Sequence, residues 1–255
     1  MLDNPQETKR RLVEWIKDYF RQNGPECTAV IGISGGKDSS ICAALCLEAL
    51  GPERVLGVLM PNGEQPDSED SRSLVKALGL KAIEINIEQG YRGLLAALGG
   101  KERLGKDALI NLPPRLRMAT LYAIAQSLPK GGRVVNTCNR SEDYIGYSTK
   151  FGDAAGDFSP LSNLLVSEVR QIGKCTNVPL VLVEKTPSDG LCGQTDEEKI
   201  GFSYETLDRY ILTGEAPAET KAKIDRMHER NLHKLLPMPS FDPNENASQF
   251  PNRRN

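Results

Sequence analysis

Apolar and polar positions alternate along the chain in blocks that predict strands separated by helices. Residues 29–33 and 55–60 are unbroken apolar runs, which are typical of strands buried on both faces of a sheet. Apolar residues spaced three or four apart predict helices at 13–20, 37–50 and 68–78. Strands that alternate with helices in this way indicate a parallel sheet.

The pattern continues further along the chain with shorter signals. Residues 81–87 and 133–137 predict two more strands, and a helix is expected from 88 to about 98. Pro113 and Pro114 are expected to open a helix that ends near Leu128, because proline fits the first helical turn. We therefore expect an α/β fold, with a doubly wound, mainly parallel sheet, helices on both faces and a helical C-terminal extension.

Length and composition favour a single domain. The chain has 255 residues, of which 39% are hydrophobic, and this is enough to bury a complete core. We expect one domain over residues 1–240 and a flexible tail over 241–255, where Asn and Pro are frequent. The segments 146–160 and 186–196 are rich in Gly, Asp, Ser and Pro, and are expected to close over a bound substrate.

The most informative polar segment, Ser34–Ser39, joins the first strand to the helix that follows it. Its glycines let the backbone approach an anion, and the N–H groups at the start of the helix point toward the same place. The hydroxyls of Ser34, Ser39 and Ser40 are expected to add donors. Asp38 would repel phosphate oxygens unless a divalent cation lay between them, so the segment predicts a polyphosphate bound with Mg²⁺.

Spacing separates the glycine motifs that could describe this segment. The pattern G-x-x-x-x-G-K-S/T fails because Ile31 occupies its first glycine position and Asp38 follows the lysine. The pattern G-x-G-x-x-G fails because Ser34 occupies its second glycine position. The pattern G-x-S-x-G matches residues 32–36 and leaves a serine hydrolase open, with Ser34 as its nucleophile.

The pattern S-G-G-x-D-S matches Ser34–Ser39 in full. The segment therefore resembles the pyrophosphate-binding loop of the N-type ATP pyrophosphatases, which cleave ATP between its α and β phosphates to adenylate an acceptor. This resemblance implies an adenine nucleotide alpha hydrolase-like, or Rossmann-like, fold. It also implies that ATP contacts Gly32, Ile33, Ser34, Gly35, Gly36, Lys37, Asp38 and Ser39.

Charge and cysteine spacing narrow the choice of acceptor. A net charge of −2 and a pI of about 5.9 give no basic surface for RNA, so no nucleic-acid partner is expected. The sequence has neither a signal-peptide pattern nor an apolar run of membrane length, which predicts a cytoplasmic protein with no membrane partner. The six cysteines include no C-x-x-C pair, so neither a zinc site nor a redox site is indicated.

A group of motifs after the last predicted strand resembles one family, the NAD synthetases. The resemblance extends from about residue 10 to residue 236, in the same order along the chain. The matching segments are Thr137–Glu142, Gly146–Asp153, Asp157, Pro160–Leu161, Pro61–Gln65, Arg115–Met118, Asp189–Leu191, Asp196–Glu197, Gly201, Tyr204, Asp208–Tyr210 and His233–Lys234.

The resemblance implies a reaction and a set of site residues. Enzymes of this family convert deamido-NAD to NAD: ATP, the co-substrate, adenylates the nicotinate carboxylate, and ammonia then displaces AMP. Mg²⁺ would be held by Asp38 and Glu142, and ATP would also contact Gln65, Thr137 and Ser188. Deamido-NAD would contact Arg115, Lys150, Asp157, His233 and Lys234. Arg115 and Arg117 point to different sides of a helix, so one of the two is expected to reach the ligand.

One departure from the family pattern concerns a phosphate-binding lysine. Where that lysine commonly follows the Pro-Leu turn, this chain has Val166. Lys37 or Lys185 is our hypothesis for the missing positive charge. A helix over 110–128 is a candidate surface for the homodimer that the resemblance implies.

Free ammonia is the expected nitrogen donor, because only about thirty residues precede the phosphate loop, too few for an amidase domain. Another ATP pyrophosphatase, a serine hydrolase and a non-catalytic ATP-binding module remain alternatives.

Overall fold

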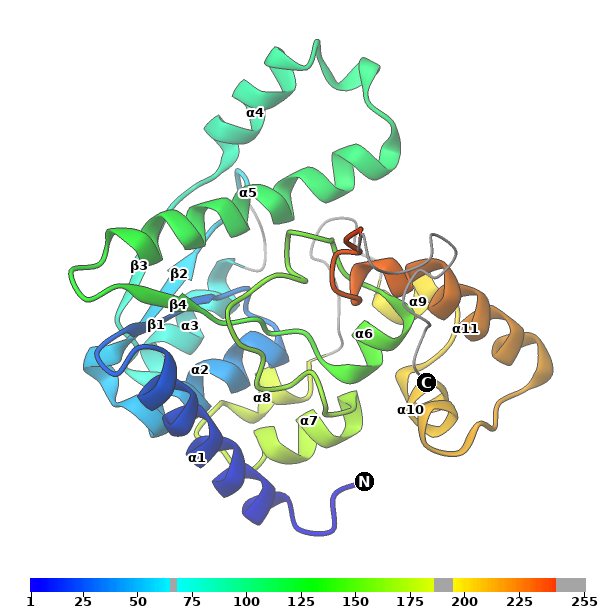
Figure 1. Ribbon diagram of the computed structural model, residues 1–255, viewed down its shortest axis with the longest axis horizontal. Helices are drawn as coiled ribbons and strands as arrows, with labels where there is room; N and C mark the ends of the chain where they lie inside the picture. The colour runs from blue at the N-terminus through cyan, green and yellow to red at the C-terminus, as the bar shows by residue number, and fades with distance from the viewer. Residues whose placement is uncertain (65–67, 186–194, 242–255) are drawn as a thin grey trace.

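The fold is built on a parallel sheet, seen here in a computed structural model that describes residues 1–64, 68–185 and 195–241. Within these ranges the sheet has four strands in the order β3–β2–β1–β4 (Figure 1). The strands are β1 (Thr28–Gly32), β2 (Val55–Leu59), β3 (Ala82–Glu84) and β4 (Gly132–Val134). The chain runs outward from β1 to β3 and then returns to the other side of β1, so the sheet is doubly wound as predicted.

One face of the sheet carries the larger part of the core. Ala29 and Ile31 of β1 point to this face, where they join buried side chains such as Phe20, Leu45 and Ile172. The helices that supply these side chains are α1 (Pro5–Asn23), α2 (Lys37–Leu50), α3 (Ser68–Leu78), α7 (Val166–Gly173) and α8 (Leu180–Val183).

The opposite face is covered by the long helix α5 (Lys106–Ser127), which follows α4 (Glu88–Ala97). Val30 of β1 points to this face and packs with Met118 and Leu121 of α5. A Cβ atom on Gly132 would lie 2.8 Å from the Cα of Ala125, so only glycine lets α5 approach β4 this closely. Helices therefore cover both faces, and the predicted fold class is confirmed.

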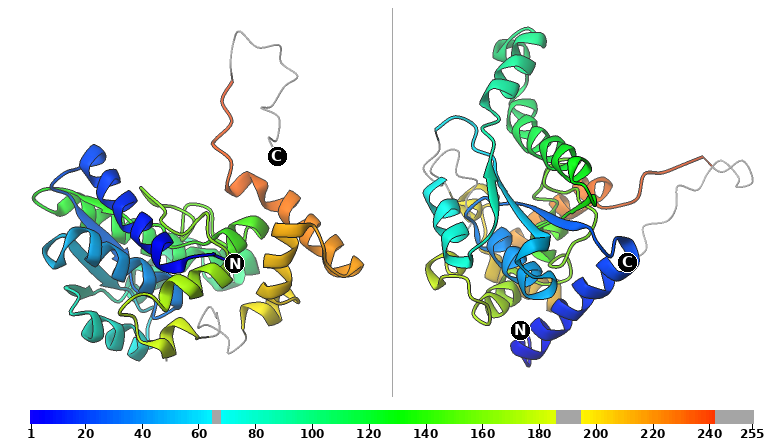
Figure 2. Two further views of the ribbon diagram at one scale, coloured as in Figure 1. Left: turned by 90° about the horizontal axis from the view of Figure 1, so that it is seen from below. Right: turned by 90° about the vertical axis from the view of Figure 1, so that its left-hand side faces the viewer.

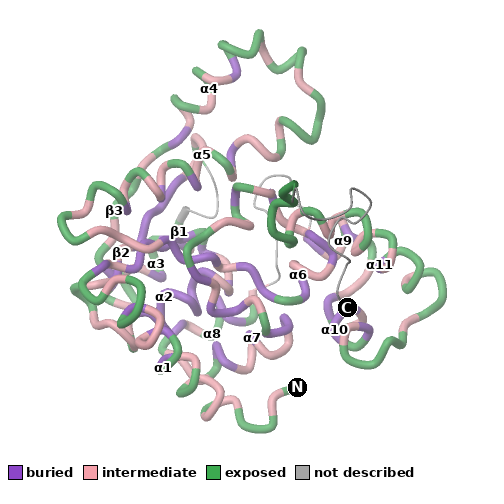
Figure 3. The backbone as a smooth tube through the Cα atoms, in the orientation of Figure 1, coloured by how far each residue is buried: buried purple, intermediate pink, exposed green. Residues whose placement is uncertain are grey.

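The prediction that two prolines open a helix is wrong. The helix α5 begins at Lys106, and Pro113 and Pro114 lie inside it. Proline removes a helical N–H donor, but the first turn still forms. The negative charge of Asp107 interacts favourably with the N-terminal end of the helix dipole, and the side-chain amide of Asn111 donates to the carbonyl of Asp107 (2.7 Å). This end of α5 and the neighbouring α4 project from the body, and many of their residues are exposed (Figure 3).

The C-terminal extension is helical, as expected, and lies to one side of the sheet (Figure 2). It has its own core, in which Ile145, Val166 and Tyr204 pack together. Its helices are α6 (Arg140–Ile145), α9 (Asp196–Ile200), α10 (Tyr204–Thr213) and α11 (Ala218–Asn231). Short 3₁₀ turns are η1 (Pro52–Arg54), η2 (Lys101–Arg103) and η3 (Leu232–Lys234).

Two further expectations concern the extent of the chain. The single domain over 1–240 stays a prediction, and the predicted tail over 241–255 lies, apart from its first residue, outside the described residues. Over the ranges that the structure describes, no helix combines the length and the apolar character needed to cross a membrane.

Candidate active site

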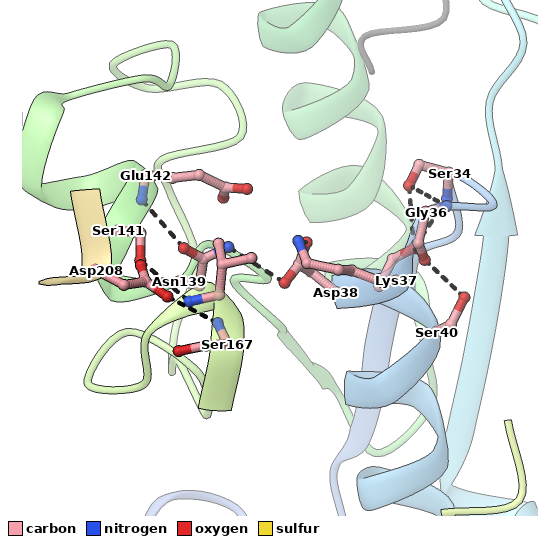
Figure 4. Close-up of polar contacts among 12 residues, drawn as sticks. Ser34, Gly36, Lys37, Asp38, Ser40, Asn139, Ser141, Glu142, Ser167 and Asp208 are labelled. Carbon is pink, nitrogen blue, oxygen red and sulfur yellow. Dashed lines mark hydrogen bonds and ion pairs between the residues drawn. The ribbon is translucent and has the colours of Figure 1, made fainter. Parts of the chain in front are cut away.

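The candidate site lies where β1 and β4 end side by side. The strand order changes direction at β1, and such a switch point leaves an opening at the carboxyl ends of the neighbouring strands. The loop 33–36 joins β1 to α2 at this edge, and residues 135–139 join β4 to α6. Figure 4 shows Asn139, at the end of the second connection, facing Asp38 in the first turn of α2.

The loop after β1 requires glycine for two reasons. Gly35 has φ of +79°, in the left-handed region that other residues rarely adopt. A Cβ atom there would also lie 3.0 Å from the Cβ of Asp70 and from the backbone nitrogen of Ser71. Gly36 is the N-cap of α2, so the N–H groups of the first turn are directed into the opening. This arrangement suits an anion at the start of α2.

The serine hydroxyls divide into one that faces solvent and two that support the loop. Ser39 and Ser40 are buried, and both donate to the carbonyl of Gly36, at 3.2 and 2.7 Å. Both hydroxyls thus stabilise the loop, and the expectation that they donate to a ligand stays a prediction. Ser34 is exposed, and its oxygen accepts from the backbone N–H of Gly36 (3.2 Å).

Ser34 lacks the neighbours of a hydrolase nucleophile. Its hydroxyl lies 3.0 Å from that of Ser39 rather than beside a base. The chain has two histidines, and both bond elsewhere: His228 Nδ1 to the carbonyl of Tyr144 (2.7 Å) and His233 Nδ1 to that of Arg230 (3.1 Å). The geometry therefore disfavours a serine hydrolase.

Lys37 pairs with a carboxylate of the same loop. Its ammonium group is 2.6 Å from Asp38 Oδ2, and the residue is only 3% exposed. Burial lowers the pKa of Lys37, but the carboxylates of Asp38 and Glu142 outweigh this effect and raise it. Lys37 is therefore a buried cation whose charge is already matched by protein carboxylates.

Asn139 connects the two predicted metal ligands. Its amide Nδ2 donates to Asp38 Oδ1 (3.2 Å), and its Oδ1 accepts from the backbone N–H of Glu142 (3.1 Å) as the N-cap of α6 (Figure 4). The side chain is fully buried, so both bonds are shielded from water. Our sequence reasoning assigned no role to Asn139, although an asparagine just before a helix is a recognisable N-cap signal.

Glu142 is the second carboxylate of the site. Burial raises its pKa well above the usual range, and the nearby charge of Asp38 adds to the shift, while Lys37 and the bond with Asn139 oppose it. Two carboxylates that repel each other are stabilised by a cation between them. In the described part of the chain, no three His, Cys, Asp or Glu side chains gather into a metal site. Mg²⁺ is commonly held by one or two carboxylates plus substrate phosphates, so this pair fits it.

A buried hydroxyl beside these carboxylates also fits a hydrated cation. Tyr204 is 1% exposed, and its hydroxyl has no hydrogen-bond partner among the described residues. Burial raises the pKa of Tyr204, and the charges of Glu142, Asp196 and Asp38 raise it further. A water molecule bound to a cation would satisfy this hydroxyl, since outer groups of this kind orient metal-bound ligands.

A second set of buried bonds fixes α6 against α7 and α10. The hydroxyl of Ser141 donates to Asp208 Oδ1 and accepts from the backbone N–H of Val166 (3.0 Å). Asp208 Oδ2 also accepts from the backbone N–H of Ser167 (2.9 Å), at the start of α7. The C-terminal extension thus holds the helix that carries Glu142.

The structure explains how Val166 is accommodated. Its side chain is 1% exposed and packs into the C-terminal core, where a lysine would have to bury its charge. Of the two proposed substitutes, Lys37 is buried against Asp38. Lys185 is partly exposed and lies 2.6 Å from Asp70, the residue that packs against Gly35. Lys185 therefore lies beside the loop and is the better placed of the two.

The sequence pattern did not indicate a role for Arg170. It lies on α7, one turn after Val166, and its Nε atom is buried with no hydrogen-bond partner among the described residues. Its charge acts on Lys37, which places the guanidinium near the phosphate loop. An unpaired guanidinium nitrogen is a natural donor to a phosphate oxygen.

Most residues predicted to bind the acceptor come together although they are far apart in the sequence. Arg115 Nε donates to the carbonyl of Lys150 (3.2 Å), and Lys150 Nζ donates to that of His233 (2.6 Å). Lys234 Nζ donates to the carbonyl of Gly146 (2.7 Å). This group is rich in positive charge, as an anionic acceptor requires. Arg117 turns the other way and donates to the carbonyl of Met60 (2.9 Å), so the prediction that the two arginines face different sides is confirmed.

Other predicted residues have different positions. Asp157 lies beside Val134, the last residue of β4. Its carboxylate accepts from the backbone N–H of Val134 (2.7 Å) and from the hydroxyl of Tyr122 (3.2 Å). Thr137 lies half-buried in the connection from β4 to α6. Gln65 and Ser188 lie outside the described residues.

Known proteins match this chain over most of its length. A family model described as NAD synthase matches residues 8–241. A protein of Carboxydothermus hydrogenoformans named NH(3)-dependent NAD(+) synthetase is 39% identical over 235 residues, which is 91% of this chain and 95% of that protein.

Solved structures match as well. One titled NMN synthetase from Francisella tularensis has a TM-score of 0.85 and 34% identity, over 95% of this chain and 99% of that one. An NH3-dependent NAD synthetase from Campylobacter jejuni has a TM-score of 0.75 and 26% identity, over 94% and 99% of the two chains. The match of the family model and the length over which the relatives align confirm the resemblance that the motifs indicated: the chain belongs to the NAD synthase family.

Proposed function

We propose that this protein amidates deamido-NAD to NAD with ammonia, at the expense of ATP, and releases AMP and pyrophosphate. The observation that carries the proposal is the link from Asp38 through Asn139 to Glu142 at the glycine loop, since it brings metal-type carboxylates to a phosphate-binding backbone. The name of the Carboxydothermus relative supports the same reaction.

In the first step, a carboxylate oxygen of the nicotinate group forms a bond to the α-phosphorus of ATP. The bond from that phosphorus to the bridging oxygen breaks, and pyrophosphate leaves. The N–H groups at the start of α2 bind the leaving group, with Arg170 and Lys185 as flanking cations. Asp38 and Glu142 would hold Mg²⁺, which when bound supplies neutralisation of the phosphate charge.

In the second step, the lone pair of ammonia forms the new C–N bond and AMP leaves with the electrons of the broken acyl–oxygen bond. The nitrogen then loses a proton to water. The chain supplies position rather than a covalent nucleophile. Cys138 agrees with this, because it is 5% exposed and burial raises the pKa of its thiol well above the usual range.

A second acceptor has support from one observation. The Francisella tularensis structure is titled NMN synthetase, and a chain that forms NMN in the same way would amidate the mononucleotide acid. Both acceptors carry the same nicotinate carboxylate, so the same loop and carboxylates serve either reaction. The two differ in the adenosine half, which only the dinucleotide brings to the site.

The test is a reconstituted reaction with ATP, MgCl₂, ammonium and either deamido-NAD or nicotinate mononucleotide. We expect AMP, pyrophosphate and the amidated product in equal amounts, with deamido-NAD the better acceptor. Product from the mononucleotide alone would reassign the acceptor. AMP release without either product would contradict the proposed reaction and leave another ATP pyrophosphatase. Glutamine in place of ammonium should give no product.

The assembly and the location of the protein stay predictions. We propose a homodimer formed at the projecting end of α5 and the adjoining α4, where Ile110 is 46% exposed and Leu98, the C-cap of α4, is 44% exposed. Sedimentation of wild type and of Ile110→Glu would test this, since a monomer in both cases would contradict it. A cytoplasmic location, expected from the sequence, would be checked by cell fractionation.

A further inference from the structure

Phe151 has a backbone conformation that its side chain does not favour. Its φ is +63°, and among the described residues it is the one non-glycine residue with a positive φ. A bulky side chain in this left-handed region crowds the following carbonyl, and glycine would avoid the strain. Strain of this kind persists only where the surrounding structure imposes it, and it concentrates at ligand-binding sites.

The surrounding turn imposes this conformation. The N–H of Gly152 donates to the carbonyl of Thr149 (2.9 Å), and the N–H of Thr149 donates to Asp153 Oδ1 (2.9 Å). The hydroxyl of Thr149 donates to Asn111 Oδ1 (2.6 Å), and a Cβ atom on Gly152 would lie 3.0 Å from Pro114 Cβ, so the turn packs closely on α5. The chain therefore holds Phe151 in place from both sides.

The ring gains no burial in return, because Phe151 is 61% exposed. It stands beside Lys150, one of the cationic residues that are predicted to bind the acceptor. Lys150 Nζ lies 5.4 Å from the centre of the ring, and the same ammonium group donates to the carbonyl of His233. Arg115 contacts the carbonyl of Lys150. An exposed aromatic ring beside the ammonium group of Lys150, with Arg115 bonded to the backbone of Lys150, suits a ligand that combines a planar ring with phosphates.

We propose that Phe151 stacks on a heteroaromatic ring of the acceptor nucleotide, and that the strained turn presents the ring for this purpose. The inference rests on the proposed function, because it assumes that the acceptor lies beside Lys150. The two candidate rings are the pyridine ring and the adenine ring. Both offer the same π face, and the two acceptors distinguish them, since nicotinate mononucleotide has no adenine.

The experiment compares Phe151→Gly, Phe151→Asn and Phe151→Tyr by steady-state kinetics and thermal unfolding. Gly and Asn both accept a positive φ and both lack the ring, but Asn adds less backbone freedom. We expect both variants to melt above wild type and to raise the KM for the acceptor roughly ten-fold or more, a loss in the range of one stacked base. The KM for ATP should not change, and Phe151→Tyr should resemble wild type.

The acceptor whose KM rises in the variants identifies the ring that stacks on Phe151. A higher KM for both acceptors assigns the pyridine ring, and a higher KM for deamido-NAD alone assigns the adenine ring. A wild-type KM for both acceptors in Phe151→Gly overturns the inference but leaves the proposed function intact. A change of sedimentation with an unchanged KM also overturns it, in favour of a contact between two copies of the chain. If the wild-type protein amidates neither acceptor, the proposed function and this inference fail together.

Discussion

Asn139 Nδ2 lies 3.2 Å from Asp38 Oδ1, a contact between residues 101 positions apart that joins the β4 side of the site to the β1 side. The other end of the same amide caps α6 and fixes the backbone of Glu142. One buried side chain thus sets the separation of the two carboxylates. This relationship gives the first prediction.

Asn139→Asp should weaken divalent-cation binding more than it weakens the fold. Aspartate keeps the acceptor that caps α6, but it loses the donor to Asp38 and adds a like charge. We expect at least a ten-fold higher dissociation constant for Mn²⁺, measured by calorimetry. Asn139→Ala is the comparison: it loses the cap as well, and its free energy of unfolding should fall by about 1–3 kcal/mol. Equal Mn²⁺ affinity in wild type and Asn139→Asp would refute the bridging role.

The pKa of Glu142 predicts that the affinity for a divalent cation rises with pH. Burial and Asp38 raise this pKa from 4.5 to about 8. At a pH between these two values, Glu142 is protonated in the metal-free folded protein and ionised in the unfolded chain. The contribution of Glu142 to the stability of the metal-free protein therefore falls as pH rises. A cation that binds to Glu142 must displace this proton. We expect Mn²⁺ affinity to increase from about pH 6 to about pH 8, with proton release detected in calorimetry with two buffers.

Glu142→Gln should abolish both the proton release and most of the binding. Glu229→Gln, on the exposed face of α11, is the matched control and should behave like wild type. Binding that does not depend on pH in the wild-type protein would contradict the assigned ligand.

Tyr204→Phe should stabilise the metal-free protein while weakening its response to Mg²⁺. The substitution removes a buried hydroxyl that has no partner, so the free energy of unfolding should rise by about 1 kcal/mol. Tyr210→Phe, on the same helix, is the matched control. The hydroxyl of Tyr210 bonds with Asp225 and accepts from Lys221 (2.9 Å), so its loss should destabilise by about 1 kcal/mol.

Denaturant unfolding and the Mg²⁺ concentration for half-maximal activity would be measured for both tyrosine variants. Only Tyr204→Phe should need more Mg²⁺. A destabilised Tyr204→Phe with normal Mg²⁺ dependence would show that the hydroxyl has a structural partner instead.

Lys185→Ala should raise the KM for ATP several-fold with little loss of stability, because Lys185 and Asp70 form a partly exposed pair beside the loop. Lys37→Ala should instead destabilise the fold by about 3 kcal/mol, since it leaves Asp38 without its buried cation. Pyrophosphate release and chemical unfolding would separate the two effects. Lys174→Ala, which breaks an exposed pair with Glu184, is the control. Normal pyrophosphate release by both loop variants would show that neither lysine compensates for Val166.

The pattern of apolar residues was enough to predict the helices whose ends are marked by glycine. The helices α2 and α3 begin and end at the predicted residues, because glycines flank α2 and Gly79 ends α3. The strand predicted over 81–87 is shorter, since β3 pairs with β2 only over Ala82–Glu84. The start of α5 was missed because a helix tolerates proline where neighbouring side chains and solvent satisfy the freed carbonyls.

The site was harder to predict because its main contacts are not local. The ammonium group of Lys185 reaches Asp70 across 115 positions, and nothing in either segment signals that contact. The order of the strands decides which loops meet, and the sequence pattern did not specify this order. The orphan hydroxyl of Tyr204 is likewise visible only once packing has removed its access to water.

The bonds from Asp208 to Ser141 and Ser167 have a consequence for the order of events during synthesis. A nascent chain completes the phosphate loop early, but Glu142 is seated only after residue 208 has emerged and α10 has docked. We expect a ribosome-bound chain that stops before α10 to lack ATP turnover, because α6 and its Glu142 are then not yet held in place.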